Sequence, residues 1–304
     1  MPCGSQTPEG RLPVSAVRTF DVDDWDAARL VADKHGRRIS LCIPCRNEAD
    51  SVGAIVEAAR RELIEAHGVL DELIVLDDRS TDGTADVAAA AGATVIPIEQ
   101  IHALHGDGDG KGNALWATLQ VSDGDVVVWC DGDVTTFTAD WVVKLAAPLL
   151  IDDDVAIVKP IYRRPTDQGG GGRTTELVAR PLLELFAPEL AAIAQPLAGE
   201  YAVRRQVVEA IPIVQSWGAE IAMLLDIAAR HGAGAIAQVC LGPRRHRHHA
   251  LAALAPQARD VIAAALLRFG HPAPTDPSAL DIWSRANRTR PGRSGPASPS
   301  DSAT

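Results

Sequence analysis

Residues 125–133 read DVVVWCDGD, a short apolar run that ends in two aspartates separated by one glycine. A continuous apolar run bounded by turn residues is typical of a strand buried on both faces. Three similar runs precede it, at 37–44 (RRISLCIP), 71–78 (DELIVLDD) and 93–98 (ATVIPI), and stretches with helical spacing of apolar residues separate them. The resulting β-α-β-α-β-α-β order predicts an α/β protein with a Rossmann-like, doubly wound and mostly parallel sheet.

The polar residues that follow these strands are the first candidates for a site. In doubly wound sheets, ligands bind beyond the carboxyl ends of the strands. Those ends carry PCRNE at 44–48, DDRS at 77–80 and CDGD at 130–133. We therefore expect these three clusters to lie side by side around one crevice.

Changes in composition suggest how the chain is organised. Residues 1–18 and 272–304 are rich in Pro, Ser, Gly and Thr, which predicts flexible tails. Residues 19–139 hold the strand–helix repeat and form a first half. Residues 140–271 contain longer helical stretches, at 141–150, 176–190 and 220–231, and form a second, fused half. The glycine run 169–172 is either a loop over the site or a plain linker.

Charge and cysteine usage narrow the class of protein. The 304 residues include 29 Lys and Arg against 40 Asp and Glu, a net charge of −11, which opposes general binding to nucleic acid or to an anionic membrane. No stretch approaches the ~18 uncharged apolar residues of a membrane span, and the start lacks a secretory signal, so we expect a cytoplasmic protein. Five scattered cysteines fit a reducing compartment. Cys42 and Cys45 form a CxxC, but no second pair completes a zinc site.

Asp131 and Asp133 are the candidate metal ligands. Two carboxylates at i and i+2, where a strand opens into a loop, can face one divalent cation. Ligands that are all oxygen suit Mg²⁺ or Mn²⁺, which complete their shell with phosphate oxygens. An isolated Asp-Gly-Asp is also a common turn, but the polar clusters after the first two strands favour the metal site.

Those clusters resemble the opening of GT-A-fold glycosyltransferases. IPCRNEADSV at 43–52 ends the first strand, and DDRSTDGT at 77–84 ends the second, with Ser80, Thr81 and Asp82 as candidate caps of the next helix. In that fold, these regions hold the uridine and ribose of a sugar nucleotide, and the DxD motif holds the metal and the diphosphate. The resemblance implies nucleotide contacts from Pro44, Arg46, Glu48, Asp78 and Ser80, and metal and diphosphate contacts from Asp131, Gly132 and Asp133.

Later segments narrow the resemblance. In order they are HGDGDGKGNALWATL (105–119), GGRTTELVARPLLELF (171–186), PLAGEYAVRR (196–205), WGAEIAMLLD (217–226) and PRRHRHHAL (243–251). From about Arg18 to Phe269 the chain resembles the glucosyl-3-phosphoglycerate synthases, retaining GT-A enzymes related to the mannosyl-3-phosphoglycerate synthases. The resemblance implies that 19–139 is the nucleotide-sugar-binding half and 140–271 the acceptor-binding half. It also implies a donor contact from Lys111, acceptor contacts from Gly172, Arg173 and Thr175, a sugar contact from Glu220, and a metal ligand in His246.

Three of these positions can also be interpreted from local chemistry. Arg173 follows four glycines and precedes a helix start, so its guanidinium and the free helix amides can converge on one anion; otherwise it is a solvated loop arginine. Lys111 occupies a similar junction, although GKG lacks the spacing of a P-loop. Glu220 begins an apolar helix, where a buried carboxylate needs a partner such as a sugar hydroxyl, unless it is a solvated helix-start glutamate.

The basic run 244–249 (RRHRHH) includes two departures from that group. It supplies positive charge and an imidazole beside a diphosphate, or it is an exposed basic loop. The group has an asparagine, which contacts the acceptor, where this chain has His248, and an arginine where it has His249. His248 is therefore a candidate acceptor contact, and an acceptor other than 3-phosphoglycerate stays open. Gly132 replaces a bulkier residue of the group and is expected to leave more room near the metal.

These features predict a metal-dependent hexosyltransferase that moves glucose from UDP-glucose to a small anionic acceptor. The resemblance implies 3-phosphoglycerate as that acceptor, retention of configuration and a homodimer. No second carboxylate has a clear claim as covalent nucleophile, which favours a front-face path, and the expected catalytic residues are Asp133, Glu220 and Arg173. The alternatives are a GT-A enzyme of secondary metabolism with another donor and acceptor, a nucleotidyltransferase, and a non-catalytic sugar-nucleotide binder.

Overall fold

The computed structural model of the protein describes residues 16–163, 172–245, 254–271 and 284–285. Most of the two predicted tails and the first three glycines of the run 169–172 lie outside these residues. The strands are β1 (Arg18–Thr19), β2 (Ile39–Cys45), β3 (Glu72–Asp77), β4 (Thr94–Pro97), β5 (Val126–Trp129), β6 (Ile157–Arg163), β7 (Tyr201–Arg204), β8 (Ile213–Val214), β9 (Ile236–Pro243) and β10 (Ser284–Arg285).

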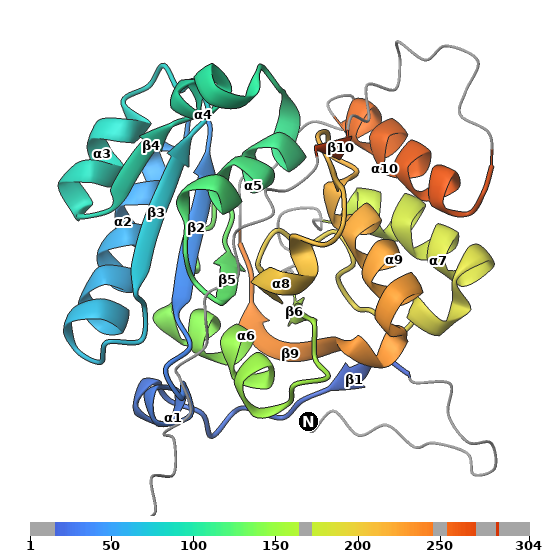
Figure 1. The fold of residues 1–304 in the computed structure, drawn as a ribbon, viewed down its shortest axis with the longest axis horizontal. Helices are drawn as coiled ribbons and strands as arrows, with labels where there is room; N and C mark the ends of the chain where they lie inside the picture. The colour runs from blue at the N-terminus through green and yellow to red at the C-terminus, as the bar shows by residue number, and fades with distance from the viewer. Residues whose placement is uncertain (1–15, 164–171, 246–253, 272–283, 286–304) are drawn as a thin grey trace, which may run out of the picture.

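The helices alternate with the strands through the first half of the chain, as predicted (Figure 1). The α-helices are α1 (Ala27–Ala32), α2 (Ala49–Ala59), α3 (Thr84–Ala91), α4 (Ile98–His105), α5 (Gly110–Val121), α6 (Ala139–Ile151), α7 (Arg180–Phe186), α8 (Arg205–Val208), α9 (Ala219–His231) and α10 (Leu254–Arg268). Shorter 3₁₀- or π-helical turns are η1 (Arg60–Glu65), η3 (Thr175–Ala179), η4 (Pro188–Leu190) and η5 (Ala233–Ala235). The predicted helical stretch 176–190 is therefore divided, with a break before Pro188.

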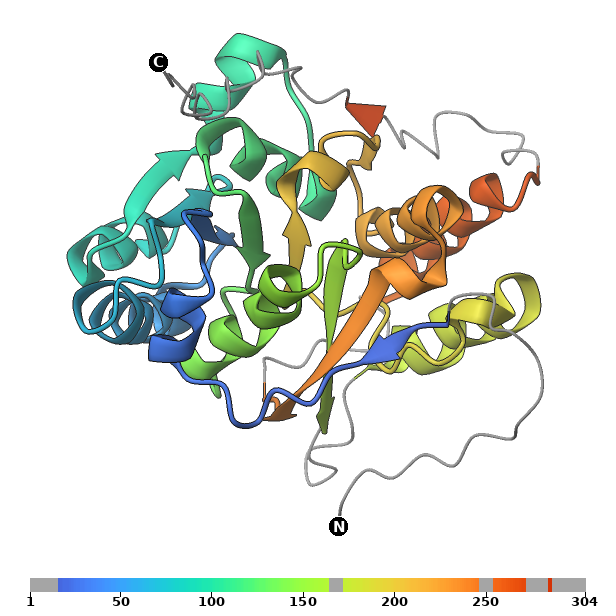
Figure 2. The same cartoon turned by 60° about the horizontal axis from the view of Figure 1, so that its bottom comes forward.

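One sheet runs through both predicted halves. Within the described residues, eight strands follow the order β1-β9-β6-β7-β5-β2-β3-β4, and a separate pair joins β10 to β8. Figure 2 shows the large sheet crossing the molecule, from β3 and β4 on the left to β9 and β1 on the right. Its strand pairs are parallel except those made by β7, which is antiparallel to both β5 and β6. The mostly parallel, doubly wound sheet is confirmed.

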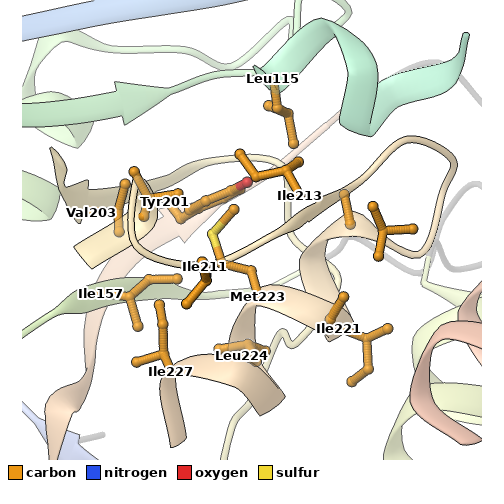
Figure 3. Packing of buried hydrophobic residues seen from close by; sticks show 14 of the residues in the cluster. Leu115, Ile157, Tyr201, Val203, Ile211, Ile213, Ile221, Met223, Leu224 and Ile227 are labelled. Carbon is orange, nitrogen blue, oxygen red and sulfur yellow. The ribbon is translucent and has the colours of Figure 1, made fainter. Parts of the chain in front are cut away.

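Helices cover both faces of this sheet because successive strand residues point to opposite sides. Leu41 and Val128 face a core shared with α1, α2, α3 and α6. Cys42 and Trp129, their chain neighbours, face a second core shared with α4, α5, α9 and α10. Figure 3 shows part of this second core, where Tyr201 packs among Ile213, Met223 and other apolar side chains.

None of the helices in the described ranges is long and apolar enough to span a membrane. The parallel strands β2, β3 and β5 end at Cys45, Asp77 and Trp129, and their pairing aligns these ends at one edge of the sheet. The crevice predicted from the three polar clusters has to open at this edge.

Candidate active site

A cleft of about 610 Å³ opens at the carboxyl ends of β2, β3 and β5. It brings together most of the residues predicted from the sequence, which come from segments far apart in the chain. These are Pro44, Arg46, Glu48, Asp78, Lys111, Asp131, Gly132, Asp133, Gly172, Arg173, Thr175 and Glu220. His246 and His248 lie outside the described residues, so their predicted roles stay predictions.

Ser80 does not line the cleft; it joins two loops at its rim. Its hydroxyl accepts a hydrogen bond from the Asn47 amide at 3.0 Å, and the Thr81 amide donates to Asn47 Oδ1 at 2.8 Å. Of the three predicted helix caps, Asp82 accepts from the Thr84 amide at the start of α3, at 3.0 Å. The cap prediction is therefore wrong for Ser80 and Thr81, whose polar groups tie the loop after β3 to the loop after β2.

Two residues in these loops have left-handed backbone. Asn47 and Arg79 both have φ of +60°, a region that asparagine tolerates and that arginine rarely adopts. Two ion pairs hold the Arg79 guanidinium, to Asp78 at 2.8 Å and to Asp109 at 2.9 Å. Arg79 thereby joins the end of β3 to the glycine loop before α5, two walls of the cleft, a role that the sequence analysis did not predict.

Close packing explains why the residue between the two aspartates, Gly132, has no side chain. A Cβ at this position would lie 2.6 Å from Cys45 Sγ, and Ser51 Oγ in α2 donates a hydrogen bond to the Gly132 carbonyl at 2.6 Å. The turn is thus packed against the end of β2. The expectation that Gly132 leaves room near the metal is wrong, because Cys45 fills that space.

A chain of ion pairs crosses the floor of the cleft. Lys111 Nζ lies 2.8 Å from Asp131 Oδ1 and 2.8 Å from Glu220 Oε1. On the other side, Arg244 Nη2 lies 3.1 Å from Asp131 Oδ2 and 2.6 Å from Glu200 Oε1. Asp131 therefore stands between two cations, and each cation is shared with a second, buried carboxylate.

These pairings shift the acid–base properties of the cations. Burial lowers the pKa of Lys111, but the carboxylates of Asp131 and Glu220 raise it further, so the net pKa lies above its ordinary value. For Arg244 the same competition between burial and Glu200 also leaves the pKa raised. Both side chains are fixed positive charges at physiological pH.

Asp133 is the carboxylate of this network whose charge is least balanced by nearby cations. Its Oδ1 is buried, has no hydrogen-bond partner among the described residues, and lies 4.0 Å from Arg244 Nη2. Burial, followed by the charge of Asp131, raises the pKa of Asp133 from 3.8 to about 6. An orphaned, buried carboxylate oxygen that resists ionisation is the donor that a divalent cation would satisfy.

The donor set fits Mg²⁺ or Mn²⁺. Four carboxylates and two cations form the network, which carries a net charge of −2 when all are ionised: Asp131, Asp133, Glu200 and Glu220 against Lys111 and Arg244. A divalent cation would neutralise that charge. No cluster of three His, Cys, Asp or Glu ligands occurs within the described ranges, so Asp131 and Asp133 would need further ligands from His246, water or a bound diphosphate.

The sequence analysis did not identify Glu200 as a residue of the site, nor the ion pairs that Arg244 forms with Glu200 and Asp131. Glu200 directly precedes β7, which runs antiparallel beside β5 with Tyr201 opposite Trp129. The start of an antiparallel strand lies at the same edge as the ends of its parallel neighbours, which brings Glu200 to the DxD turn. Gly199 lies closer still, because a Cβ there would come within 2.1 Å of Asp131 Oδ1. Only the segment PLAGEYAVRR signalled this region in the sequence.

Lys159 is a second residue that the sequence analysis missed. This lysine in β6 is fully buried, donates to the Ala198 carbonyl at 2.7 Å and lies 4.2 Å from the centre of the Tyr201 ring. Burial lowers the pKa of Lys159 to about 7. It supports the turn 197–199, of which Leu197 and Gly199 line the cleft.

The predicted acceptor contacts Gly172, Arg173 and Thr175 line the same cleft. Gly172 has φ of +85°, Arg173 and Thr174 begin the helical segment that continues into η3, and Thr175 is buried. Trp217 and three residues of α10, Leu254, Gln257 and Val261, also line the cleft. A guanidinium beside a helix start can bind an anion, as predicted from the sequence.

The cysteines of the CxxC are structural. Cys42 and Cys45 are both buried and free, and burial raises the pKa of the Cys42 thiol to about 12 and that of Cys45 well above its ordinary value. Thiols of this kind are poor nucleophiles and poor metal ligands.

The sheet, the DxD motif at the end of β5 and the cleft define a nucleotide-sugar-dependent glycosyltransferase. Residues 40–209 match the family described as glycosyl transferase family 2, and the chain belongs to this family. Within it, the chain groups with the glucosyl-3-phosphoglycerate synthases. It is 44% identical to the glucosyl-3-phosphoglycerate synthase of Mycolicibacterium paratuberculosis over 266 residues, which cover 84% of this chain and 80% of the relative.

Solved structures agree with this grouping. The Mycobacterium tuberculosis glucosyl-3-phosphoglycerate synthase in complex with Mn²⁺, UDP-glucose and phosphoglyceric acid is 40% identical, with a TM-score of 0.80, and the match covers 86% of this chain and 90% of that one. A complex of the same enzyme with Mg²⁺ and UDP is 41% identical, with a TM-score of 0.79 over 85% of this chain and 88% of that one.

Proposed function

We propose that this protein transfers glucose from UDP-glucose to 3-phosphoglycerate in a reaction that depends on Mg²⁺ or Mn²⁺. The observation that carries this proposal is the cleft itself. At the carboxyl edge of the sheet it joins the DxD carboxylates, the Lys111–Glu220 pair and Arg173. The identity of 44% to a glucosyl-3-phosphoglycerate synthase supports the same substrates.

The donor end of the cleft is the part built on β2, β3 and β5. We assign the nucleoside to the wall formed by Pro44, Arg46, Glu48 and Asp78, with Ser80 supporting that wall through Asn47. Asp131 and Asp133, with His246 as the proposed third protein ligand, would hold the cation. That cation supplies charge stabilisation for the diphosphate leaving group.

Glu220 and Lys111 are placed to act on the transferred sugar and the diphosphate. Glu220 is buried and forms an ion pair with Lys111 through Oε1 at 2.8 Å, which leaves acceptor capacity for sugar hydroxyls. Lys111 is a fixed cation next to Asp131 and can stabilise the departing diphosphate. The two side chains position the donor and need not change protonation state.

Arg173, Gly172 and Thr175 would bind the anionic groups of the acceptor, with His248 completing the contact in place of asparagine. The carboxylates nearest the DxD turn are engaged by cations: Asp131 and Glu220 by Lys111, and Glu200 by Arg244. Among the described carboxylates at this turn, these three are therefore not free to act as a covalent nucleophile, which supports a front-face path. In that path the acceptor hydroxyl attacks C1 as the bond to the diphosphate breaks, and a diphosphate oxygen takes the hydroxyl proton.

The experiment is a matrix of UDP- and GDP-sugars against 3-phosphoglycerate and other small acceptors, with Mg²⁺, Mn²⁺ or EDTA, read by mass spectrometry. The expected result is a glucosyl-3-phosphoglycerate product and UDP, formed only with metal. NMR of the anomeric proton tests retention. If product forms only with another acceptor, that compound replaces 3-phosphoglycerate as the proposed substrate. Release of pyrophosphate would indicate nucleotidyl transfer. Binding of a UDP-sugar without turnover would contradict the proposal that the protein is an enzyme.

Assembly and location complete the proposal. Leu177, Leu185 and Phe186 are exposed apolar side chains on neighbouring turns η3 and α7, a surface that suits a homodimer. Sedimentation analysis of the protein, and of a Leu185→Glu variant, tests that expectation: a monomeric variant supports this surface, and an unchanged dimer moves the interface elsewhere. The free cysteines in the described ranges fit a cytoplasmic location, which cell fractionation tests.

A further inference from the structure

Arg244 occupies an unusual place for an arginine. Its side chain is almost fully buried at the DxD turn, between Asp131 and Glu200, and its guanidinium carbon lies 5.4 Å from the centre of the Tyr162 ring. Its Nη2 is 3.1 Å from Asp131 Oδ2 and 4.0 Å from Asp133 Oδ1. The guanidinium therefore stands beside both carboxylates that would ligate the metal.

Glu200 determines where that guanidinium lies. Its side chain is fully buried, and a single oxygen accepts from Arg244 Nε at 2.9 Å and from Nη2 at 2.6 Å. The other oxygen, Oε2, has no hydrogen-bond partner within the described residues. Glu200 directly precedes β7, which pairs with β5, and Arg244 directly follows β9, so strands of one sheet bring both side chains to this edge.

The charges of this pair act on the metal site in opposite directions. The network has four carboxylates, two at the DxD turn and those of Glu200 and Glu220, and two cations, Lys111 and Arg244. Its net charge is −2 when all six groups are ionised. Removing Arg244 alone would leave −3, and removing the charge of Glu200 alone would leave −1. Removing both would restore −2. Because Glu200 and Arg244 are buried beside these carboxylates, each of these changes alters the attraction for a divalent cation.

We propose that Arg244, held by Glu200, is a resident counter-ion of the DxD carboxylates that competes with the divalent cation, so that Glu200 and Arg244 together set the metal affinity. This inference rests on the proposed metal-dependent function. Arg244 stabilises two neighbouring carboxylates that would otherwise repel each other in a buried site before metal arrives. A cation held by Asp131 and Asp133 would replace the contact of the guanidinium with Asp131, while Arg244 would keep its bonds to Glu200.

The test measures the Kd for Mn²⁺ in the full, metal-stripped protein without donor or acceptor, by electron paramagnetic resonance of free Mn²⁺ and by calorimetry. Arg244→Gln should bind Mn²⁺ at least ~10-fold more tightly than the unmodified protein, and Glu200→Gln at least ~10-fold more weakly, because a unit charge acts on a divalent ion over a few ångströms. The double variant should return to within ~3-fold of the unmodified protein.

The matched control is a buried ion pair remote from the cleft. Arg205 forms an ion pair with Glu209 at 3.1 Å and is also buried, so Arg205→Gln loses a buried guanidinium without changing the charge at the DxD turn. It should leave the Mn²⁺ Kd unchanged. Thermal melts of all variants in EDTA verify that each is folded.

The opposite signs distinguish this role from a merely structural one. If Arg244→Gln and Glu200→Gln both weaken Mn²⁺ binding, or if neither changes it, the inference is overturned and the metal-dependent function stands. If the double variant does not recover, charge is not the cause and the inference also fails. Absence of Mn²⁺ binding in the unmodified protein, even with UDP added, would instead overturn the metal-dependent function and this inference with it.

Discussion

Replacing Asp133 with asparagine should stabilise the metal-free protein while it abolishes transfer. The folded protein raises the pKa of this carboxyl from 3.8 to about 6, so ionisation is more costly in the folded state than in the unfolded chain. The stability that the protonated group contributes is present at low pH and is lost as pH rises through about 6. At pH 7 the charged form therefore costs ~3 kcal/mol, which Asp133→Asn would recover in a side chain of nearly the same shape.

The assay is thermal unfolding in EDTA at pH 7 and pH 5, followed by the same melts with saturating Mn²⁺. A gain of ~3 kcal/mol corresponds to a melting temperature higher by roughly 5 °C for a chain of this size. At pH 5 the difference should shrink to about half, since most of the unmodified protein already carries the proton on Asp133. Mn²⁺ should raise the melting temperature of the unmodified protein much more than that of the variant.

Activity and a control complete the test. Loss of one charged metal ligand should lower kcat by at least ~10²-fold with UDP-glucose and 3-phosphoglycerate. Asp24→Asn, at an exposed aspartate away from the cleft, should change neither the melts nor kcat. A metal-free Asp133→Asn protein that melts below the unmodified one at pH 7 would refute the argument that burial destabilises this carboxylate. Equal responses to Mn²⁺ would show that Asp133 is not a ligand.

Three further predictions concern the acceptor, the β7 turn and the histidines. Arg173→Ala should raise the KM for the acceptor at least ~10-fold and leave the KM for UDP-glucose within ~2-fold in steady-state kinetics, because one lost anion contact affects one substrate; equal increases would assign Arg173 to the diphosphate. Gly199→Ala should lower kcat and weaken Mn²⁺ binding in calorimetry, because its Cβ would lie 2.1 Å from Asp131 Oδ1; normal values would show that the turn yields at little cost. His246→Ala should weaken activation by Mn²⁺ and reduce any loss of activity as pH falls through about 6.5, because only a neutral imidazole binds metal. His248→Asn should change acceptor preference and leave metal dependence unchanged. The reverse result would place the metal ligand at His248.

The local elements and part of the site could be predicted from the sequence because they depend on neighbouring residues. Apolar runs such as 126–129 specify buried strands, and helical spacing between them specifies the crossovers that place strand ends at one edge. Asp131 and Asp133 directly follow such a strand, so their place at the cleft follows from local pattern. The glycine-to-helix junctions at Lys111 and Arg173 could be recognised in the same way.

The tertiary structure decided what surrounds those residues. β7 enters the sheet antiparallel between β5 and β6, a choice made by long-range pairing that no local pattern specifies. That insertion brings Glu200 and Gly199 against the DxD turn and, through Glu200, fixes Arg244 beside Asp131. The raised pKa of Asp133 has the same origin, because burial and the charges of distant segments act only once the chain has folded. The sequence alone therefore indicated the strand–helix repeat and the carboxylates that follow its strands, whereas folding determined the charges that act on them.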